Sequence, residues 1–466
     1  MKILLPFIFA IVFLLSPRPV AFDLKLKSLS DKSNLVDSYK TILAFEPWRS
    51  ITLEKLTGTL LKSGNAKEAI KVLEEANQKE RLSESGDRIL AAAYEQDGQN
   101  DLALETWRNV LNSSPGEREM YMKVYQLQNQ LRLEDEGLLT LEKLLIHFPD
   151  DAEGLYLTGL IYFSRDDERG LQNLEKSSQS DDQFSQDGEV LLNAAIQAEK
   201  SDNPAYQKVI RGRGLSAVKA WQLAERNFEQ AVTLDPDYVE GWAFLAEAKQ
   251  QTGSGDGLSE LQKAEKLNPK SQIVKGLFAL YWRRHNQFDQ AIRLISQAAQ
   301  QEPEGSSWQI EWANTLVEKG DLQEALPHFK EALEIEPLNV ENKKLLAEFC
   351  INFRFELRET GLPTAREVAA KYPNDPSSHD LMGRTFSTLG DFGSAERSYD
   401  RALQINPEFT PTHLHLAQLY LEQSNLSRAY SYLKMAVNQD NDGNTKEIAA
   451  RLLSRYYHEE IVLDPE

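Results

Sequence analysis

The sequence predicts an all-α fold in which antiparallel helix pairs stack into an elongated array. Two stripes of small and apolar residues, each with the spacing of one helix face, flank a turn at Gly390. The stripes consist of Met382, Gly383, Phe386, Ala395, Tyr399 and Ala402. A proline, Pro407, follows the second stripe, and the pattern returns about 34 residues later with Leu416 in the place of Met382.

This pattern resembles the tetratricopeptide repeat (TPR), a helical hairpin in which small residues, aromatic residues and a closing proline occupy fixed places. Closing prolines recur through the second half of the chain at Pro236, Pro269, Pro303, Pro337, Pro373 and Pro407. Because one hairpin cannot bury its apolar face without a stacked neighbour, the resemblance implies a right-handed TPR superhelical solenoid of about eleven repeats.

The repeat pattern also divides the chain into parts. They are a signal peptide or N-terminal anchor (1–21), a lead-in with a capping half-repeat (22–49), an N-terminal array of four repeats (50–184), an extra single helix (185–204), a C-terminal array of seven repeats (205–443), and a capping helix with an acidic tail (444–466). The single helix is expected because the register breaks there and only one apolar face is present. The step from Pro337 to Pro373 is two residues longer than its neighbours, which predicts an extended first helix over 345–361.

The repeat restricts which residues fit at two kinds of place. Alanine is expected where the two helices of a hairpin approach closely, because a larger side chain would overpack the contact. These places hold Ala224, Ala291, Ala325 and Ala395. Glycine, or asparagine as a substitute, is expected after the first helix, where the backbone takes a positive φ. The turn residues are Gly64, Gly98, Asn286, Gly320 and Gly390.

The N-terminus has the features of an export segment. Lys2 is followed by an uninterrupted apolar run, Ile3 to Leu15, which as a helix would span only about 20 Å and is too short to cross a bilayer. A secretory signal peptide is therefore predicted. Residues 16–21 make a poor cleavage site, so an uncleaved anchor remains the alternative. Either form places the body of the protein outside the cytoplasm, in the cell envelope, the periplasm or the medium.

Composition excludes several classes of partner and chemistry. The net charge of -20 argues against nucleic acid, because such binding requires Lys and Arg to neutralise phosphates. The single cysteine, Cys350, rules out an intramolecular disulfide and a cysteine-based metal cluster. Cys350 occupies a helical place that is aromatic in sister repeats, which favours a buried core thiol.

No residue pattern indicates a catalytic, metal or cofactor site. His413 and His415 are two residues apart and would point to different faces of a helix, so they cannot share a metal ion. Residues 438–443 resemble the start of a calcium loop, but Ala449 holds the place of the bidentate glutamate. The glycine-rich segment 252–257 has neither a preceding strand nor a lysine, which favours a loop between helices.

Tetratricopeptide arrays usually bind partners in a concave groove lined by first helices, and the resemblance implies which residues face that groove. In the N-terminal array they are Tyr156, Leu160 and Phe163. In the C-terminal array they are Tyr206, Arg213, Glu247, Leu280, Arg283, Asn314, Val317, Arg384 and Gln418. We expect the guanidinium groups of Arg213 and Arg283 to bind carboxylates or carbonyls of a partner. The alternative is that both arginines pair with Glu247 from the repeat between them.

These observations predict a non-catalytic, exported scaffold that binds a protein or peptide partner, because repeats occupy the whole chain and leave no room for a catalytic domain. An accessory subunit of a cell-envelope enzyme, or of a glycan-processing or assembly complex, is the alternative function. Neither function requires a cofactor, and membrane attachment is expected only through residues 1–21. The groove lacks the Lys and Asn arrangement with which some TPR domains clamp a C-terminal carboxylate, so that activity is not implied.

Overall fold

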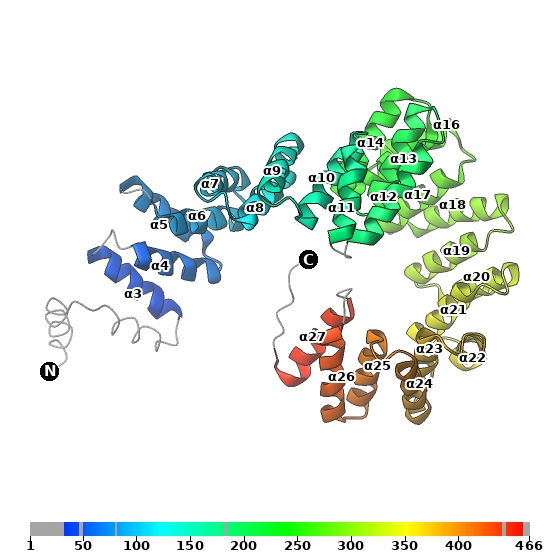
Figure 1. The fold of residues 1–466 in the computed structure, drawn as a ribbon. Helices are drawn as coiled ribbons and strands as arrows, with labels where there is room; N and C mark the ends of the chain where they lie inside the picture. Colours follow the sequence, from blue (N-terminus) through cyan, green and yellow to red (C-terminus); the bar gives the residue numbers. More distant parts are fainter. Residues whose placement is uncertain (1–31, 46–49, 80–81, 181–183, 440–443, 460–466) are drawn as a thin grey trace. The chain divides into compact units, whose positions relative to one another are not determined.

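The computed structural model describes residues 32–45, 50–79, 82–180, 184–439 and 444–459. Every regular element within these ranges is a helix (Figure 1). The chain divides into two compact units, an N-terminal unit that ends at Leu234 and a C-terminal unit that begins at Asp235. This division lies one hairpin beyond the single helix at which the sequence analysis separated the two arrays.

The N-terminal unit is built from helical hairpins and two additional helices. Its helices are α3 (Lys32–Phe45), α4 (Ser50–Lys62), α5 (Ala66–Lys79), α6 (Glu84–Gln96), α7 (Asn100–Ser113), α8 (Arg118–Gln130), α9 (Glu134–His147), α10 (Ala152–Ser164), α11 (Arg169–Ser180), α12 (Ser185–Ala198), α13 (Pro204–Ala217) and α14 (Trp221–Leu234). The hairpins are α4–α5, α6–α7, α8–α9, α10–α11 and α13–α14. Helix α3 packs on α4, and α12 packs against both α11 and α13.

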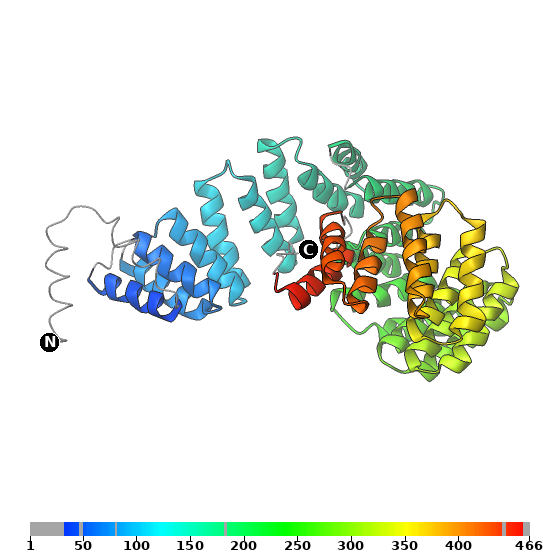
Figure 2. The same cartoon turned by 90° about the horizontal axis from the view of Figure 1, so that it is seen from below.

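The C-terminal unit continues the same hairpin plan. Its helices are α15 (Val239–Thr252), α16 (Leu258–Leu267), α17 (Gln272–Arg284), α18 (Phe288–Gln301), α19 (Ser306–Lys319), α20 (Leu322–Ile335), α21 (Val340–Phe353), η2 (Leu357–Gly361), α22 (Leu362–Lys371), α23 (Pro376–Thr388), α24 (Phe392–Ile405), α25 (Thr410–Glu422), α26 (Leu426–Gln439) and α27 (Asn444–Tyr457). Successive hairpins of this unit follow a curve (Figures 1 and 2). First helices such as α17, α19, α21 and α23 lie on its inner side, and second helices such as α18, α20 and α24 on its outer side.

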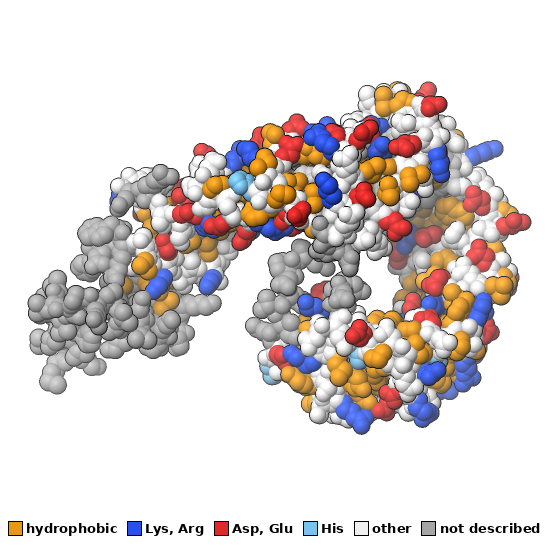
Figure 3. Space-filling view, in the orientation of Figure 1, with side chains coloured by type: hydrophobic (Ala, Val, Ile, Leu, Met, Phe, Trp, Pro, Cys, Tyr) orange, Lys and Arg blue, Asp and Glu red, His pale blue; other side chains and the backbone are white. Residues whose placement is uncertain are grey.

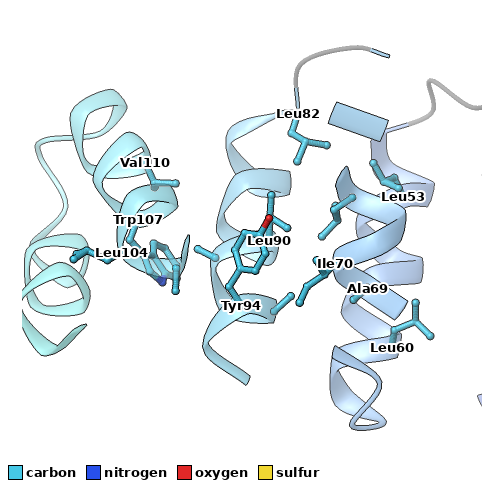
Figure 4. Packing of buried hydrophobic residues seen from close by; sticks show 14 of the residues in the cluster. Leu53, Leu60, Ala69, Ile70, Leu82, Leu90, Tyr94, Leu104, Trp107 and Val110 are labelled. Atoms are coloured by element: carbon cyan, nitrogen blue, oxygen red, sulfur yellow. The ribbon is translucent and has the colours of Figure 1, made fainter. Parts of the chain in front are cut away.

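Hydrophobic cores run from one hairpin into the next. Figure 4 shows such a core in the N-terminal unit, where Leu60 of α4 and Ile70 of α5 belong to the same buried cluster as Leu90 and Tyr94 of α6 and Trp107 of α7. No hairpin encloses its apolar residues alone, so each depends on its neighbours for burial.

The two helices of a hairpin approach closely through a small residue on the first helix and a large one on the second. A Cβ atom added at Gly383 of α23 would collide with the ring of Tyr399 on α24, and one at Gly212 of α13 would lie 2.5 Å from Cε1 of Phe228 on α14. Alanines on the second helices are equally enclosed. Ala224, Ala291, Ala325 and Ala395 are all fully buried, which confirms the prediction for these places.

The predicted turns are present with the predicted backbone. Gly64, Gly98, Gly320 and Gly390 have φ between 77° and 94°, and Asn286 has φ of 56°. The corresponding turns of other hairpins use residues without this conformational freedom, which the repeat pattern did not predict. Arg132, Asp166, Lys219 and Ser424 also have positive φ, near 60°. The hairpin closure therefore imposes the left-handed conformation even where the side chain disfavours it.

The prediction of an extended first helix over 345–361 is wrong. Helix α21 ends at Phe353, and Arg354 and Glu356 take left-handed conformations with φ of 50° and 49°. The two extra residues of this repeat are accommodated near η2, a π-helical turn that leads into the second helix, α22. Gly361 in this turn lies against Cys350, since an added Cβ would be 2.7 Å from the Cβ of that cysteine. Cys350 is fully buried as predicted, and burial raises the pKa of its thiol to about 11.

A recurrent hydrogen bond joins the end of one hairpin to the start of the next. A ring donor six residues after the closing proline bonds to the carbonyl oxygen of that proline. The Nε1 atom of Trp242 donates to Pro236 at 2.8 Å, and the Nε2 atom of His413 donates to Pro407 at 2.8 Å. The bonds of Tyr121 to Pro115 and of His379 to Pro373 follow the same rule. Because a proline carbonyl can only accept, this bond fixes the position of the proton on each histidine ring.

The predicted export segment, residues 1–21, lies outside the described residues. Among the helices that are described, none is both long enough and apolar enough to span a bilayer.

The hairpin contact yields a first testable prediction. Gly383→Ala should lower the urea midpoint of the chain, because the new methyl group must displace the Tyr399 ring at a cost of about 1–3 kcal/mol. Gly58 of α4 is a matched control, since nothing lies within 4 Å of a Cβ added there. Gly58→Ala should leave the midpoint unchanged or raise it slightly. Circular dichroism during urea titration measures both. Equal midpoints for the two variants would contradict the proposed close contact.

Candidate functional site

A cleft of about 510 Å³ opens among three first helices of the C-terminal unit, α15, α17 and α19. Its apolar lining consists of Phe244, Ile273, Leu277, Ala279, Leu280, Ile295 and Trp308. Its polar lining consists of Gln272, Arg283 and Glu311. Two of the groove residues predicted from the sequence, Leu280 and Arg283, thus lie together in one cleft.

Helix α17 supplies most of the cleft wall because of the spacing of its residues. Ile273, Gly276, Leu280 and Arg283 recur at three- and four-residue intervals, which places them on one face of the helix. Gly276 leaves room for the neighbouring helix, since a Cβ there would be 3.4 Å from Cη2 of Trp308. The indole ring therefore lies close to the backbone of α17 and closes one side of the cleft.

Arg283 and Glu311 of the polar lining belong to an ion-pair cluster that also includes Glu318. The Arg283 guanidinium donates to Glu311 Oε2 at 2.7 Å and, from Nε, to Glu318 Oε2 at 3.0 Å. The hydrogen bond to Glu318, with the charges of both carboxylates, raises the pKa of Arg283 above its usual value. The two acids belong to α19, so the cluster joins the first helices of adjacent hairpins.

Glu247 has a different partner from the one that the sequence analysis considered. Both of its carboxylate oxygens accept from Arg284, at 2.7 and 2.8 Å. Arg283, the next residue back, points instead to Glu311. The interpretation that Arg283 pairs with Glu247 is therefore wrong, because consecutive residues of a helix face different neighbours.

The other predicted groove residues are distributed over both units. Tyr206 and Arg213 belong to α13 of the N-terminal unit and do not line this cleft. Asn314 and Val317 lie on α19 beside Glu318, and both are half-buried. Arg384 and Gln418 belong to α23 and α25, first helices that lie further along the curve. Arg384 donates to Glu348 Oε1 and Asn352 Oδ1, both at 3.1 Å.

The prediction that Tyr156, Leu160 and Phe163 line a groove is wrong, because all three are buried. Helices α12 and α13 contact this part of the chain. The Tyr156 hydroxyl donates to Asp187 of α12 at 2.7 Å, and the Phe163 ring lies under the Arg211 guanidinium of α13. The single helix and the hairpin after it thus cover a face that a regular repeat would leave open.

Lys275, a residue that the sequence analysis missed, lies buried on α17 behind the cleft. Its Nζ donates to Gln301 Oε1 at 2.8 Å, and burial lowers the pKa of its ammonium group. No carboxylate of the described residues pairs with it within ion-pair distance. The signal that could have revealed it is its position, because Lys275 lies six residues after Pro269, just as Trp242 lies six residues after Pro236 in the preceding repeat.

The two histidines of α25 have separate structural roles. His413 is buried and bonds the closing proline before it, whereas His415 Nδ1 lies 2.9 Å from Asp380 Oδ1 on α23. The same Asp380 oxygen accepts from the hydroxyl of Thr412. Within the described ranges no three His, Cys, Asp or Glu side chains are grouped so that they could hold a metal ion. Residues 440–443 of the segment that resembles a calcium loop are not among those described.

A smaller hollow of about 360 Å³ lies in the N-terminal unit between α8, α9 and α14. Glu134 forms its charged centre and is paired at 2.5 Å with both Arg165 and Arg226. The pair with Arg226 joins α9 to α14, which are distant in sequence, and the pair with Arg165 joins α9 to the end of α10. Glu134 and Arg226 in the lining of this hollow are therefore already paired with each other.

Figure 3 shows charged side chains of both signs dispersed among hydrophobic ones over the visible face. The acidic excess of the sequence does not form one continuous patch on this face.

The fold defines an α-solenoid of stacked helical hairpins, and comparison with known families identifies the repeat. Tetratricopeptide-repeat family models match residues 277–340 and 388–455. The first segment includes the C-terminal part of α17 and the whole of α19, both of which contribute to the lining of the cleft. These segments therefore contain tetratricopeptide repeats, and the predicted all-α TPR solenoid is confirmed.

Solved structures of similar architecture share little sequence with this chain. Yeast Tom70 has 14% identity and a TM-score of 0.42, over 87% of this chain and 95% of that one. The Cut9–Hcn1 hetero-tetramer of APC/C has 14% identity and a TM-score of 0.35, over 92% and 87%. YrrB, described as a TPR protein with an unusual peptide-binding site, has 18% identity and a TM-score of 0.29, over 41% and 97%. With TM-scores this low, these likenesses carry no functional argument. No curated protein matches the sequence.

Proposed function

We propose that this chain is a non-catalytic scaffold that binds a peptide or protein partner on the inner side of its C-terminal unit, with the cleft between α15, α17 and α19 as the anchor point. The observation that carries the proposal is an apolar cleft on the side of the TPR array where first helices are accessible. Tetratricopeptide arrays generally serve as interaction scaffolds, which supports the same class of function.

The size and lining of the cleft favour a side-chain anchor. Its volume of about 510 Å³ lies in the range of pockets that hold small ligands or large side chains. Ile273 retains 38% of its exposure, and Leu280 and Trp308 are half-buried. Covering these apolar groups with a partner side chain would remove them from water, and buried anchors of this kind contribute most of the affinity of an interface.

The polar groups of the cleft favour binding over catalysis. Arg283 is held by Glu311 and Glu318, so its donors are already directed at carboxylates. Catalytic groups usually require a reacting atom within hydrogen-bond reach of a base and of an oxyanion donor. The arrangement at α17 and α19 instead gives a rigid, charged edge beside an apolar hollow.

Site-specific photo-crosslinking in the native host tests the proposal. A photoreactive amino acid at Leu280 should capture a defined partner, because this side chain lines the cleft. The same amino acid at Lys330, an exposed position on the outer helix α20, is the control and should not capture that partner. Equal capture from both positions, or none from Leu280, would contradict a binding site in the cleft. A captured glycosyltransferase or hydrolase would assign the accessory-subunit function.

We further propose that residues 1–21 direct the body of the protein out of the cytoplasm. The support is the basic residue followed by the apolar run from Ile3 to Leu15. An exported scaffold would meet its partner in the cell envelope or beyond it.

A reporter fusion tests the export proposal. A reporter joined after Asp31 should be active outside the cytoplasm, and the same fusion without residues 1–21 should remain inside. Cytoplasmic activity of both fusions would refute export and leave the cleft proposal unaffected.

A further inference from the structure

Four basic side chains on the inner first helices already have acidic partners. They are Arg283 and Arg284 of α17, Lys344 of α21 and Arg384 of α23. Their partners come mainly from neighbouring first helices. Each cation is thus neutralised within the array, and a partner's carboxylate would have to displace an internal one in order to bind it.

In three of these clusters the carboxylates are more exposed than the cation. The Arg283 side chain is 18% exposed, whereas Glu311 is 47% and Glu318 is 44% exposed. Lys344 and Arg384 are likewise less exposed than their partners Glu341 and Glu348. The pair of Arg284 with Glu247 is the exception, because there the arginine is the more exposed member.

Two carboxylates share one guanidinium at the cleft, so this cluster carries a net negative charge. Glu311 also lines the cleft itself, together with Leu280 and Trp308. The apolar hollow and the exposed acids therefore meet at one edge. A partner that fills the hollow brings its neighbouring residues directly against Glu311 and Glu318.

We propose that the occupant of the cleft is a peptide segment in which a Lys or Arg lies next to a large apolar side chain. This inference rests on the proposed function and specifies the partner's chemistry. The apolar side chain fills the hollow beside Leu280, while the cation adds to the Glu311–Arg283–Glu318 cluster and compensates its excess negative charge.

An acidic segment fits the same edge poorly. Its carboxylate would meet two exposed acids before it reached the more buried Arg283, and like charges brought together at an interface select against a partner. The structure thus favours the opposite of the sequence-based expectation that Arg283 binds partner carboxylates. That expectation took account of the arginine and not of the two acids that α19 places beside it.

Two fluorescent synthetic peptides test the inference with the full chain. Both contain the same Leu and Trp residues, and they differ only in having Lys or Glu at every charged position. Fluorescence anisotropy should show the Lys peptide binding about tenfold or more tightly than the Glu peptide. Leu280→Ala should weaken binding of the Lys peptide, because it removes apolar surface from the cleft.

Charge variants separate the cleft from the general acidity of the chain. Glu311→Gln combined with Glu318→Gln should lower the affinity for the Lys peptide by about tenfold. The same double variant should raise the affinity for the Glu peptide, because Arg283 then no longer pairs with the two carboxylates. Glu324→Gln combined with Glu334→Gln removes the same net charge from exposed positions of the outer helix α20 and should change neither affinity. Circular dichroism melting curves confirm that each variant is folded.

The possible outcomes distinguish the inference from the proposed function. If the Glu peptide binds as tightly as the Lys peptide and its binding still depends on Leu280, the inferred positive charge of the partner is wrong, and the cleft remains a binding site. If the α20 control variant weakens binding of the Lys peptide as much as the α19 variant does, the peptide is attracted by the overall negative charge of the chain, and the inference fails. If neither peptide depends on Leu280, the cleft is not the anchor and the proposed site fails as well.

Discussion

The close crossing of the two helices within each hairpin is the contact on which the rest of the structure depends. Gly383 lies against the ring of Tyr399, and Gly212 lies against Phe228. In these hairpins a small residue on the first helix admits a large one from the second, and in α8–α9 the sizes are reversed, with Gly137 of the second helix against Tyr125 of the first. The size pairing sets the distance between the two helices. Because each hairpin then buries its remaining apolar surface on the next, the same contact fixes the path of the array.

The rotation of the first helix also decides which residues remain accessible on the inner side. In α17 the buried residues Phe278 and Tyr281 belong to a core cluster with Leu294 of α18, whereas Ile273 and Leu280 keep more exposure and line the cleft. The next hairpin presents α19 in the same way and brings Glu311 and Glu318 to Arg283. The cleft and its charges therefore follow from hairpin packing together with the particular side chains at a few accessible places, and they require no separate structural element.

Much of the fold was predictable because the repeat encodes it locally. The buried alanines and the positive-φ glycines occupy fixed places, so their burial and conformation follow from position alone. Turns at Arg132 or Asp166 were less evident, because closure of the hairpin overrides side-chain preference there. The π-helical turn before α22 was missed because a two-residue insertion fits a longer helix and a local bulge equally well in sequence.

The site was less predictable than the fold because it depends on contacts between repeats. Leu280 and Arg283 could be placed on the inner side from the period, but their neighbours on α19 could not be specified. Tyr156 and Phe163 had the correct spacing for a groove, yet α12 and α13 cover that face. The charge that the inner side presents to solvent depends on which side chain of each ion pair is the more exposed one. The spacing of residues along the sequence does not reveal that exposure.

A double-mutant cycle at Gly383 and Tyr399 tests the hairpin contact most directly. The following hairpin has Ala417 and Leu433 at the same two places, so the combination of alanine and leucine is compatible with this geometry. We predict that Gly383→Ala combined with Tyr399→Leu is more stable than the sum of the single losses implies, with a coupling of about 1 kcal/mol or more in urea denaturation. Strictly additive losses would contradict the account, because they would show that the two residues do not share the contact that sets the hairpin.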